Sequence, residues 1–211
     1  PVSPAISNPK ISCVDFFSEQ VKPMNIIPSL VAHSSSSESV NSYKFELPVC
    51  TAVVANPPYT RQEEMEDAFY SEEYKRKLVA DAITPVTLPN NEPLEGKWSE
   101  KASIYSYFLI KSAHQFLTSR GRLGYITSNS WLDSEFGRSL KEYFLTGYKI
   151  VAVIDSSVER WFEDADINTT ILIVEKVDEL SKKSSARMRS NSSRLRSLSR
   201  IFSALHRQDL T

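Results

Sequence analysis

Residues 50–59 read CTAVVANPPY and join an apolar run to a polar turn. The small and β-branched residues at 50–55 are typical of a buried strand. The four residues at 56–59 then follow at the carboxyl end of that strand, which is the edge where ligands bind in open α/β sheets. The stretch therefore predicts a strand of an α/β sheet with a candidate site at its end.

The residue types of this turn suit the binding of a planar amine. The side chain of Asn56 offers a neutral carbonyl acceptor. Pro57 and Pro58 remove two backbone N–H donors and stiffen the turn, so we expect its carbonyl groups to point outward. Tyr59 supplies a flat ring face. Together they predict a cradle for an aromatic or amide NH2 group, and the alternative is a turn that only ends the strand.

Strand and helix patterns alternate along the rest of the chain. Apolar positions at helical spacing predict helices at 101–119 and 134–146. Further strands are predicted at 122–128, 149–155 and 169–175. No helical pattern separates the last two strands, so we expect them to pair antiparallel. This order predicts an α/β fold whose sheet is mostly parallel, with an antiparallel last strand.

Turn and cap residues predict where the helices begin and end. Gly121 suits a left-handed cap after the first helix. Asp133 or Ser134 is predicted to cap the start of the second helix. The polar pair Asn129 and Ser130 follows a predicted strand, and these residues either line the site or cap the turn.

Composition divides the chain into three parts. Residues 1–48 are predicted to be an irregular N-terminal segment and linker, with a remnant strand at 11–14. Residues 49–178 hold the strands described above, together with a charged, partly helical insert at 61–98. Residues 179–211 are predicted to be a basic, disordered tail, because eight basic residues and one acid follow Ser181. Such a tail is either simply solvated or contacts phosphates.

Bulk properties predict a globular cytoplasmic protein. The chain has 211 residues, 41% hydrophobic residues and a formal net charge of −1. No apolar window is long enough for a transmembrane helix, so no membrane partner is expected. Cys13 and Cys50 are isolated, and the three histidines show no metal-ligand spacing, so no metal is predicted. The chain begins with Pro1 and has no initiator Met, which favours a fragment.

Three blocks of sequence resemble the restriction-modification-type adenine-N6 DNA methyltransferases, the class that carries the Asn-Pro-Pro-Tyr motif. These blocks are residues 54–59, 121–132 and 162–170. The resemblance implies an incomplete Rossmann-like class I methyltransferase sheet. It also implies methyl transfer from S-adenosyl-L-methionine to an adenine that is flipped out of double-stranded DNA.

The resemblance also assigns roles to individual residues. The motif at 56–59 becomes the catalytic turn, in which Asn56 and the carbonyl of Pro57 accept hydrogen bonds from adenine N6. Tyr59 stacks on the flipped base, and Phe162 packs against the base from its other side. The cofactor is expected to contact Asp15, Phe16 and Asn56.

The chain departs from the family in its cofactor half. Its five glycines form no Gly-x-Gly turn, so the main cofactor-binding loop is missing. The resemblance therefore implies little activity alone, and a missing N-terminal part and target-recognition domain or subunit. The alternatives are a protein glutamine-N5 or RNA methyltransferase, and a non-catalytic remnant with a nucleic-acid-binding tail.

The aromatics at 105, 107, 108 and 116 are predicted to lie in the core or on the helix surface.

Overall fold

The computed structural model describes residues 15–17, 21–24, 45–59, 72–155 and 168–178. Five expectations lie wholly or partly outside these residues: the strand at 11–14, the first part of the insert, the tail, Phe162 and most of the N-terminal segment.

A four-stranded sheet forms the centre of the described part. Its strands are β3 (Cys50–Ala55), β4 (Leu117–Ser128), β5 (Tyr148–Asp155) and β6 (Thr169–Lys176), in the spatial order β3-β4-β6-β5. β3 and β4 are parallel, whereas β6 runs antiparallel to both of its neighbours. The predicted fold class, an α/β sheet with an antiparallel last strand, is confirmed.

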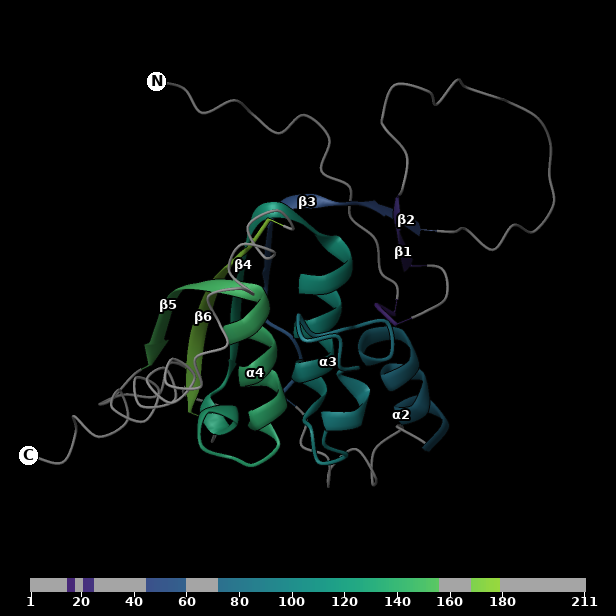
Figure 1. The fold of residues 1–211 in the computed structure, drawn as a ribbon, viewed down its shortest axis with the longest axis vertical. Coiled ribbons are helices and arrows are strands. Elements are labelled where there is room, and N and C mark those ends of the chain that lie inside the picture. Colours follow the sequence, from purple (N-terminus) through teal and green to yellow (C-terminus); the bar gives the residue numbers. More distant parts are fainter. Residues whose placement is uncertain (1–14, 18–20, 25–44, 60–71, 156–167, 179–211) are drawn as a thin grey trace, which may run out of the picture.

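Helices connect the strands. They are α2 (Glu72–Leu78), α3 (Ile104–Lys111) and α4 (Gly137–Gly147). The first two continue as wider π-helical turns, η2 (Val79–Ile83) and η4 (Ser112–Phe116). Short 3-10 turns are η3 (Glu95–Lys97) and η5 (Asn129–Leu132). In the view of Figure 1 the three α-helices follow one another from right to left as α2, α3 and α4.

The core lies between these helices and one face of the sheet. On that face Leu123 pairs with Val174, and Tyr125 pairs with Leu172, with all four side chains buried. On the other face, within the described part, Val54 is 85% exposed. The prediction that residues 50–55 form a buried strand is therefore wrong in its burial. A run of β-branched residues indicates that a segment fits a pleated sheet. It does not indicate whether both faces of that sheet are covered.

The helix predicted at 101–119 begins at Ile104 and ends at Phe116. β4 starts at once, because Leu117 pairs with Cys50 on β3. The register then shifts, and Arg120 takes the left-handed conformation with φ 61°. Gly121 is therefore no helix cap. A Cβ there would lie 2.9 Å from both Leu117 Cδ1 and Thr118 O, so close packing requires the glycine.

The start of α4 also differs from the prediction. Neither Asp133 nor Ser134 caps it, because η5 intervenes and the helix begins at Gly137. The Ser134 N–H instead donates to the Ser130 carbonyl at 3.0 Å. The N-cap residue is Phe136, and no side chain caps the helix.

Two short strands occur in the segment predicted to be a linker. β1 (Val21–Met24) and β2 (Phe45–Pro48) pair in parallel as a separate two-stranded sheet. The described helices include none that is long and apolar enough to cross a membrane.

Candidate functional site

Four chain segments meet at the carboxyl edge of β3 and β4. Because these strands are parallel and Ala55 pairs with Tyr125, the turn at 56–59 lies beside the last residues of β4. Ser128 at the end of β4 pairs with Thr169 at the start of β6. Asp155 at the end of β5 pairs with Thr170. The topology therefore gathers the Asn-Pro-Pro-Tyr turn and three polar strand ends at one edge.

The turn presents an acceptor beside a ring. Asn56 is exposed, Pro57 is buried, and Tyr59 is half-buried against the core. The Tyr59 hydroxyl donates a hydrogen bond to Asn56 Oδ1. Burial raises the pKa of Tyr59, so its hydroxyl remains a neutral donor at neutral pH. Asn56 Oδ1 keeps a second lone pair for another donor.

Hydroxyl groups order the neighbouring loop after β4. Ser128 Oγ accepts from the Ser130 N–H at 3.3 Å and donates to Ser130 Oγ at 3.0 Å. The Asn129 N–H donates to the Asn168 carbonyl at 2.9 Å, which joins the loop to the chain entering β6. Tyr105 Oη lies 3.2 Å from Ser130 Oγ, and burial raises the pKa of Tyr105 to about 12. The turn is therefore capped by Ser128, while Ser130 remains exposed at the edge.

The Asp15–Phe17 segment packs against α3 and η4. Phe16 stacks on Phe108 with a centroid distance of 5.4 Å and an interplanar angle of 10°. Asp15 is exposed, and its Oδ1 accepts from the Phe17 N–H at 3.0 Å and from Tyr74 Oη at 3.4 Å. The helix aromatics were predicted to lie in the core or on the helix surface, and they do: Tyr105, Tyr107 and Phe116 are buried, and Phe108 is partly buried against the core.

Lys111 is a buried charged residue beside the Asp15–Phe17 segment that the sequence pattern did not single out. It is buried, and its Nζ donates to Asp81 Oδ2 at 2.5 Å and to the Phe16 carbonyl at 2.6 Å. Burial lowers the pKa of Lys111, and the Asp81 carboxylate acts in the opposite direction. Lys111 follows Ile104 by seven residues on the apolar helix face, and that spacing was the available signal.

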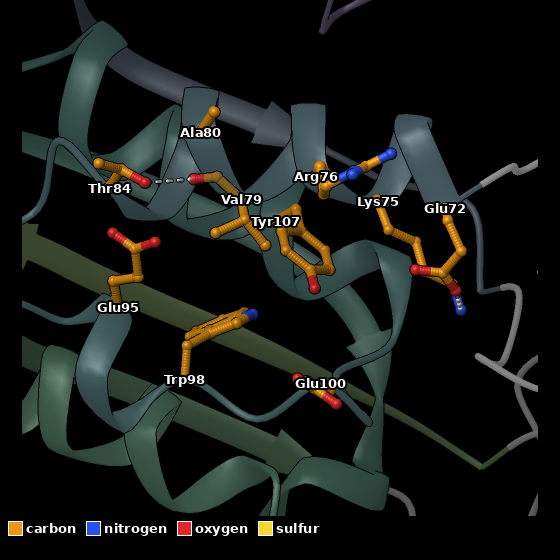
Figure 2. A pocket seen from close by; sticks show the side chains of 10 residues that line it. All are labelled: Glu72, Lys75, Arg76, Val79, Ala80, Thr84, Glu95, Trp98, Glu100 and Tyr107. Carbon is orange, nitrogen blue, oxygen red and sulfur yellow. Dashed lines mark hydrogen bonds and ion pairs between the residues drawn. The ribbon is translucent and has the colours of Figure 1, made fainter.

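A separate pocket of about 530 Å³ lies between α2, η2, the 95–100 loop and α3. Figure 2 shows Trp98 and Tyr107 as its aromatic walls, and their ring centroids are 5.4 Å apart. Lys75 and Glu72 line it and pair with each other at 3.3 Å. None of the predicted site residues lines this pocket.

The described residues contain no group of three or more His, Cys, Asp or Glu side chains that could hold a metal ion.

The Eco57I restriction-modification methylase family model matches residues 50–162. The chain belongs to this family. The match includes the Asn-Pro-Pro-Tyr turn, β4, the loop after β4 and β5, which supply most of the carboxyl edge, and it ends before β6. The resemblance to restriction-modification methyltransferases is therefore confirmed at the level of the family.

Two curated methyltransferases are similar to this chain over part of their length. The Type II methyltransferase M.AccI of Acinetobacter calcoaceticus is 28% identical over 123 residues, which are 57% of this chain and 19% of that protein. The Type II methyltransferase M.BstVI of Geobacillus stearothermophilus is 26% identical over 112 residues, which are 53% of this chain and 17% of that protein. The matched part of this chain therefore spans about a fifth of the length of these two relatives.

Solved structures of larger restriction-modification enzymes also align with this family chain. A nuclease-deletion mutant of the Type ISP enzyme LlaGI, in complex with a DNA substrate mimic, aligns with a TM-score of 0.41 at 19% identity. The alignment covers 62% of this chain and 14% of that one. The Type IIL enzyme MmeI in complex with DNA aligns with a TM-score of 0.41 at 16% identity, over 62% of this chain and 16% of that one.

Proposed function

We propose that this chain carries the amine-binding part of an S-adenosyl-L-methionine-dependent DNA adenine-N6 methyltransferase. One observation carries the proposal. In a chain of the restriction-modification methylase family, an exposed Asn56 carbonyl and the half-buried ring of Tyr59 lie side by side at the carboxyl end of β3.

The turn has the chemistry that an adenine amine requires. The N6 lone pair of adenine is delocalised into the ring and is a poor nucleophile. Asn56 Oδ1 and the Pro57 carbonyl would accept both N–H groups, which favours a localised lone pair. They would also stabilise the positive charge that grows on nitrogen. The amine would share Asn56 Oδ1 with the Tyr59 hydroxyl or displace that hydroxyl.

Stacking would hold the base once it has left the duplex. Flipping an adenine costs a few kcal/mol of lost stacking and pairing. The Tyr59 ring, and in this proposal Phe162 on the opposite side, would offset that cost by stacking. Pro58 would keep the turn stiff between the acceptor and the ring.

The residues at the Asp15–Phe17 segment fit a cofactor adenine ring. Asp15 is exposed, and its Oδ2 has no hydrogen-bond partner among the described residues, so it can accept from an amine. Phe16 offers an aromatic wall. Asn56 would border the methyl group. The bound cofactor supplies an electrophilic methyl group, and the amine gives up one proton to solvent after transfer.

A methylation assay tests this proposal. The full chain is mixed with an upstream polypeptide that supplies a glycine-rich loop, and labelled S-adenosyl-L-methionine is offered with DNA or with a release-factor peptide. We expect label in the DNA alone. Label in the peptide alone would favour the glutamine-N5 alternative, and label in neither substrate would contradict the proposal.

Variants of two exposed asparagines sharpen the assay. Asn56→Ala removes one acceptor for the amine, so we expect turnover to fall at least ~100-fold. The free energy of unfolding should stay within about 0.5 kcal/mol of the wild-type value, because Asn56 is exposed. Asn90→Ala, in a loop remote in sequence from the turn, is the matched control and should retain turnover. Wild-type turnover in Asn56→Ala would remove the proposed role.

A further inference from the structure

Lys111 is a buried cation whose hydrogen bonds join two parts of the chain far apart in sequence. Its Nζ contacts Asp81 Oδ2 at 2.5 Å in η2 and the Phe16 carbonyl at 2.6 Å. The lysine side chain is 0% exposed, whereas the Asp81 side chain is 33% exposed. An ammonium group this buried is costly unless it is paired and hydrogen-bonded, and both bonds serve that need.

Aromatic rings surround the same ammonium group. Nζ lies 4.8 Å from the ring centroid of Phe16, 5.1 Å from that of Phe17 and 6.0 Å from that of Phe116. These distances are within the range of cation–π attraction. Lys111 therefore holds Phe16 through both its backbone carbonyl and its ring.

The hydrogen bonds around Asp15 leave one carboxylate oxygen available. Its Oδ1 accepts from the Phe17 N–H at 3.0 Å, which closes a tight turn over residues 15–17. Its Oδ2 has no hydrogen-bond partner among the described residues, and Asp15 is exposed. Fixing the Phe16 carbonyl through Lys111 thus also fixes the direction in which this free oxygen points.

Stability alone does not require a charge at this position. A buried ion pair can often be replaced by apolar side chains of similar volume at no net loss of stability. A methionine among these phenylalanine rings would pack without any desolvation cost, but it could not donate to the Phe16 carbonyl. The directional donor is what distinguishes lysine from such a replacement.

We propose that Lys111 is a positioning residue that holds the Asp15–Phe17 segment against α3 and so orients Asp15 and Phe16 toward the cofactor's adenine ring. This inference rests on the proposed function for its ligand. Lys111 acts through the segment and has no contact with the reacting atoms.

The test compares two lysine side chains that each donate to a backbone carbonyl: the buried Lys111 of α3 and the partly buried Lys176 of β6. Lys111→Met removes the bond to Phe16. Lys176→Met is the matched control, because Lys176 Nζ donates to the His114 and Leu117 carbonyls at 3.0 and 2.8 Å, which lie outside the Asp15–Phe17 segment. Hydrogen exchange is measured at the Phe17 amide and, as an internal reference, at the amides of β4 and β6. Binding of S-adenosylhomocysteine is measured by titration calorimetry on the full chain mixed with the polypeptide that supplies the glycine-rich loop in the methylation assay.

In Lys111→Met we expect the Phe17 amide to exchange at least about tenfold faster, with the sheet amides unchanged. We also expect S-adenosylhomocysteine to bind about tenfold more weakly in Lys111→Met and normally in Lys176→Met. Unchanged Phe17 exchange, or equal weakening in both variants, would overturn the role of Lys111. If Lys111→Met does not fold, Lys111→Gln against Lys176→Gln gives the same comparison with a shorter, uncharged donor.

The failure of this inference differs from the failure of the proposed function. If the wild-type chain with that polypeptide does not bind S-adenosylhomocysteine at any concentration reached, the assignment of Asp15 and Phe16 to the cofactor is overturned with it. If the wild-type chain binds and Lys111→Met binds equally well, only the role of Lys111 is overturned.

Discussion

Tyr59 brings two separable groups to the Asn-Pro-Pro-Tyr turn, a stacking ring and a hydroxyl that donates to Asn56 Oδ1. Tyr59→Phe keeps the ring and frees the acceptor, so we expect the rate of DNA methylation to be retained. Tyr59→Ala removes a stacking surface worth about 1–3 kcal/mol per base, so we expect KM for DNA to rise about tenfold or more. Steady-state kinetics of the reconstituted enzyme measure both values. An equal loss in the two variants would instead assign the function to the hydroxyl.

At this scale the sequence predicted the turn and missed the lysine. Asn56 and Tyr59 follow an apolar run directly, so their place at a strand end was readable from neighbouring residues alone. The contact of Lys111 with Phe16 joins residues 95 positions apart, and no local pattern encodes such a pair. A lysine on an apolar helix face signals a buried cation but does not name its partner.

The two glycines of α4 have opposite expected responses to alanine. A Cβ at Gly137 would lie 1.8 Å from the Trp131 carbonyl oxygen, whereas nothing lies within 4 Å of a Cβ at Gly147. Gly137→Ala should therefore lower the free energy of unfolding by about 1–3 kcal/mol or more. Gly147→Ala should leave it unchanged or raise it by up to about 1 kcal/mol. Urea denaturation measures both, and similar values for the two variants would contradict this packing of α4 on η5.

The buried tyrosines of α3 and β4 predict a loss of stability in alkali. Burial raises the pKa of Tyr105 and of Tyr125 from the ordinary tyrosine value of 10.0 to about 12. The unfolded chain loses these protons first, so the stabilisation is present below pH 10 and is lost as pH rises toward about 12. Burial also raises the pKa of Tyr143 and Tyr148, so these two residues make the free energy of unfolding fall more steeply as the pH rises above 10.

Tyr125→Phe isolates one part of that slope. The variant should lose about 1 kcal/mol at neutral pH, because the hydroxyl lies 2.5 Å from Ser112 Oγ in a hydrogen bond. Above pH 10 its free energy of unfolding should fall less steeply than that of the wild type. Urea denaturation across this pH range measures the slope, and an unchanged slope would contradict the burial of this hydroxyl.

The sequence predicted which segments form strands and which form helices, but it placed the ends of several of them wrongly. The strand at 50–55 was predicted with its observed bounds, because its apolar run ends at a proline turn. The helix at 101–119 was predicted too long, since Leu117 carries the helical period but pairs with Cys50 in the sheet. Pairing across the sheet overrides local propensity, and a single sequence does not reveal which residues lie opposite.

The described part of the molecule covers one face of its sheet with helices and leaves apolar residues on the other. Val54 and Ile154 are 85% and 45% exposed, and β3 has no strand partner on its outer edge among the described residues. Mostly parallel sheets usually have both faces covered. Within the described residues this face of the sheet therefore stays uncovered.

We propose that the turn at 56–59 binds the amine of adenine in DNA. The most direct test of this proposal is the identity of the methylated base. DNA treated with the reconstituted wild-type enzyme is digested to nucleosides and analysed by mass spectrometry, in parallel with DNA treated with Asn56→Ala. We predict N6-methyladenine from the wild type and none from the variant. Methylcytosine in place of N6-methyladenine, or N6-methyladenine from both proteins, would contradict the account.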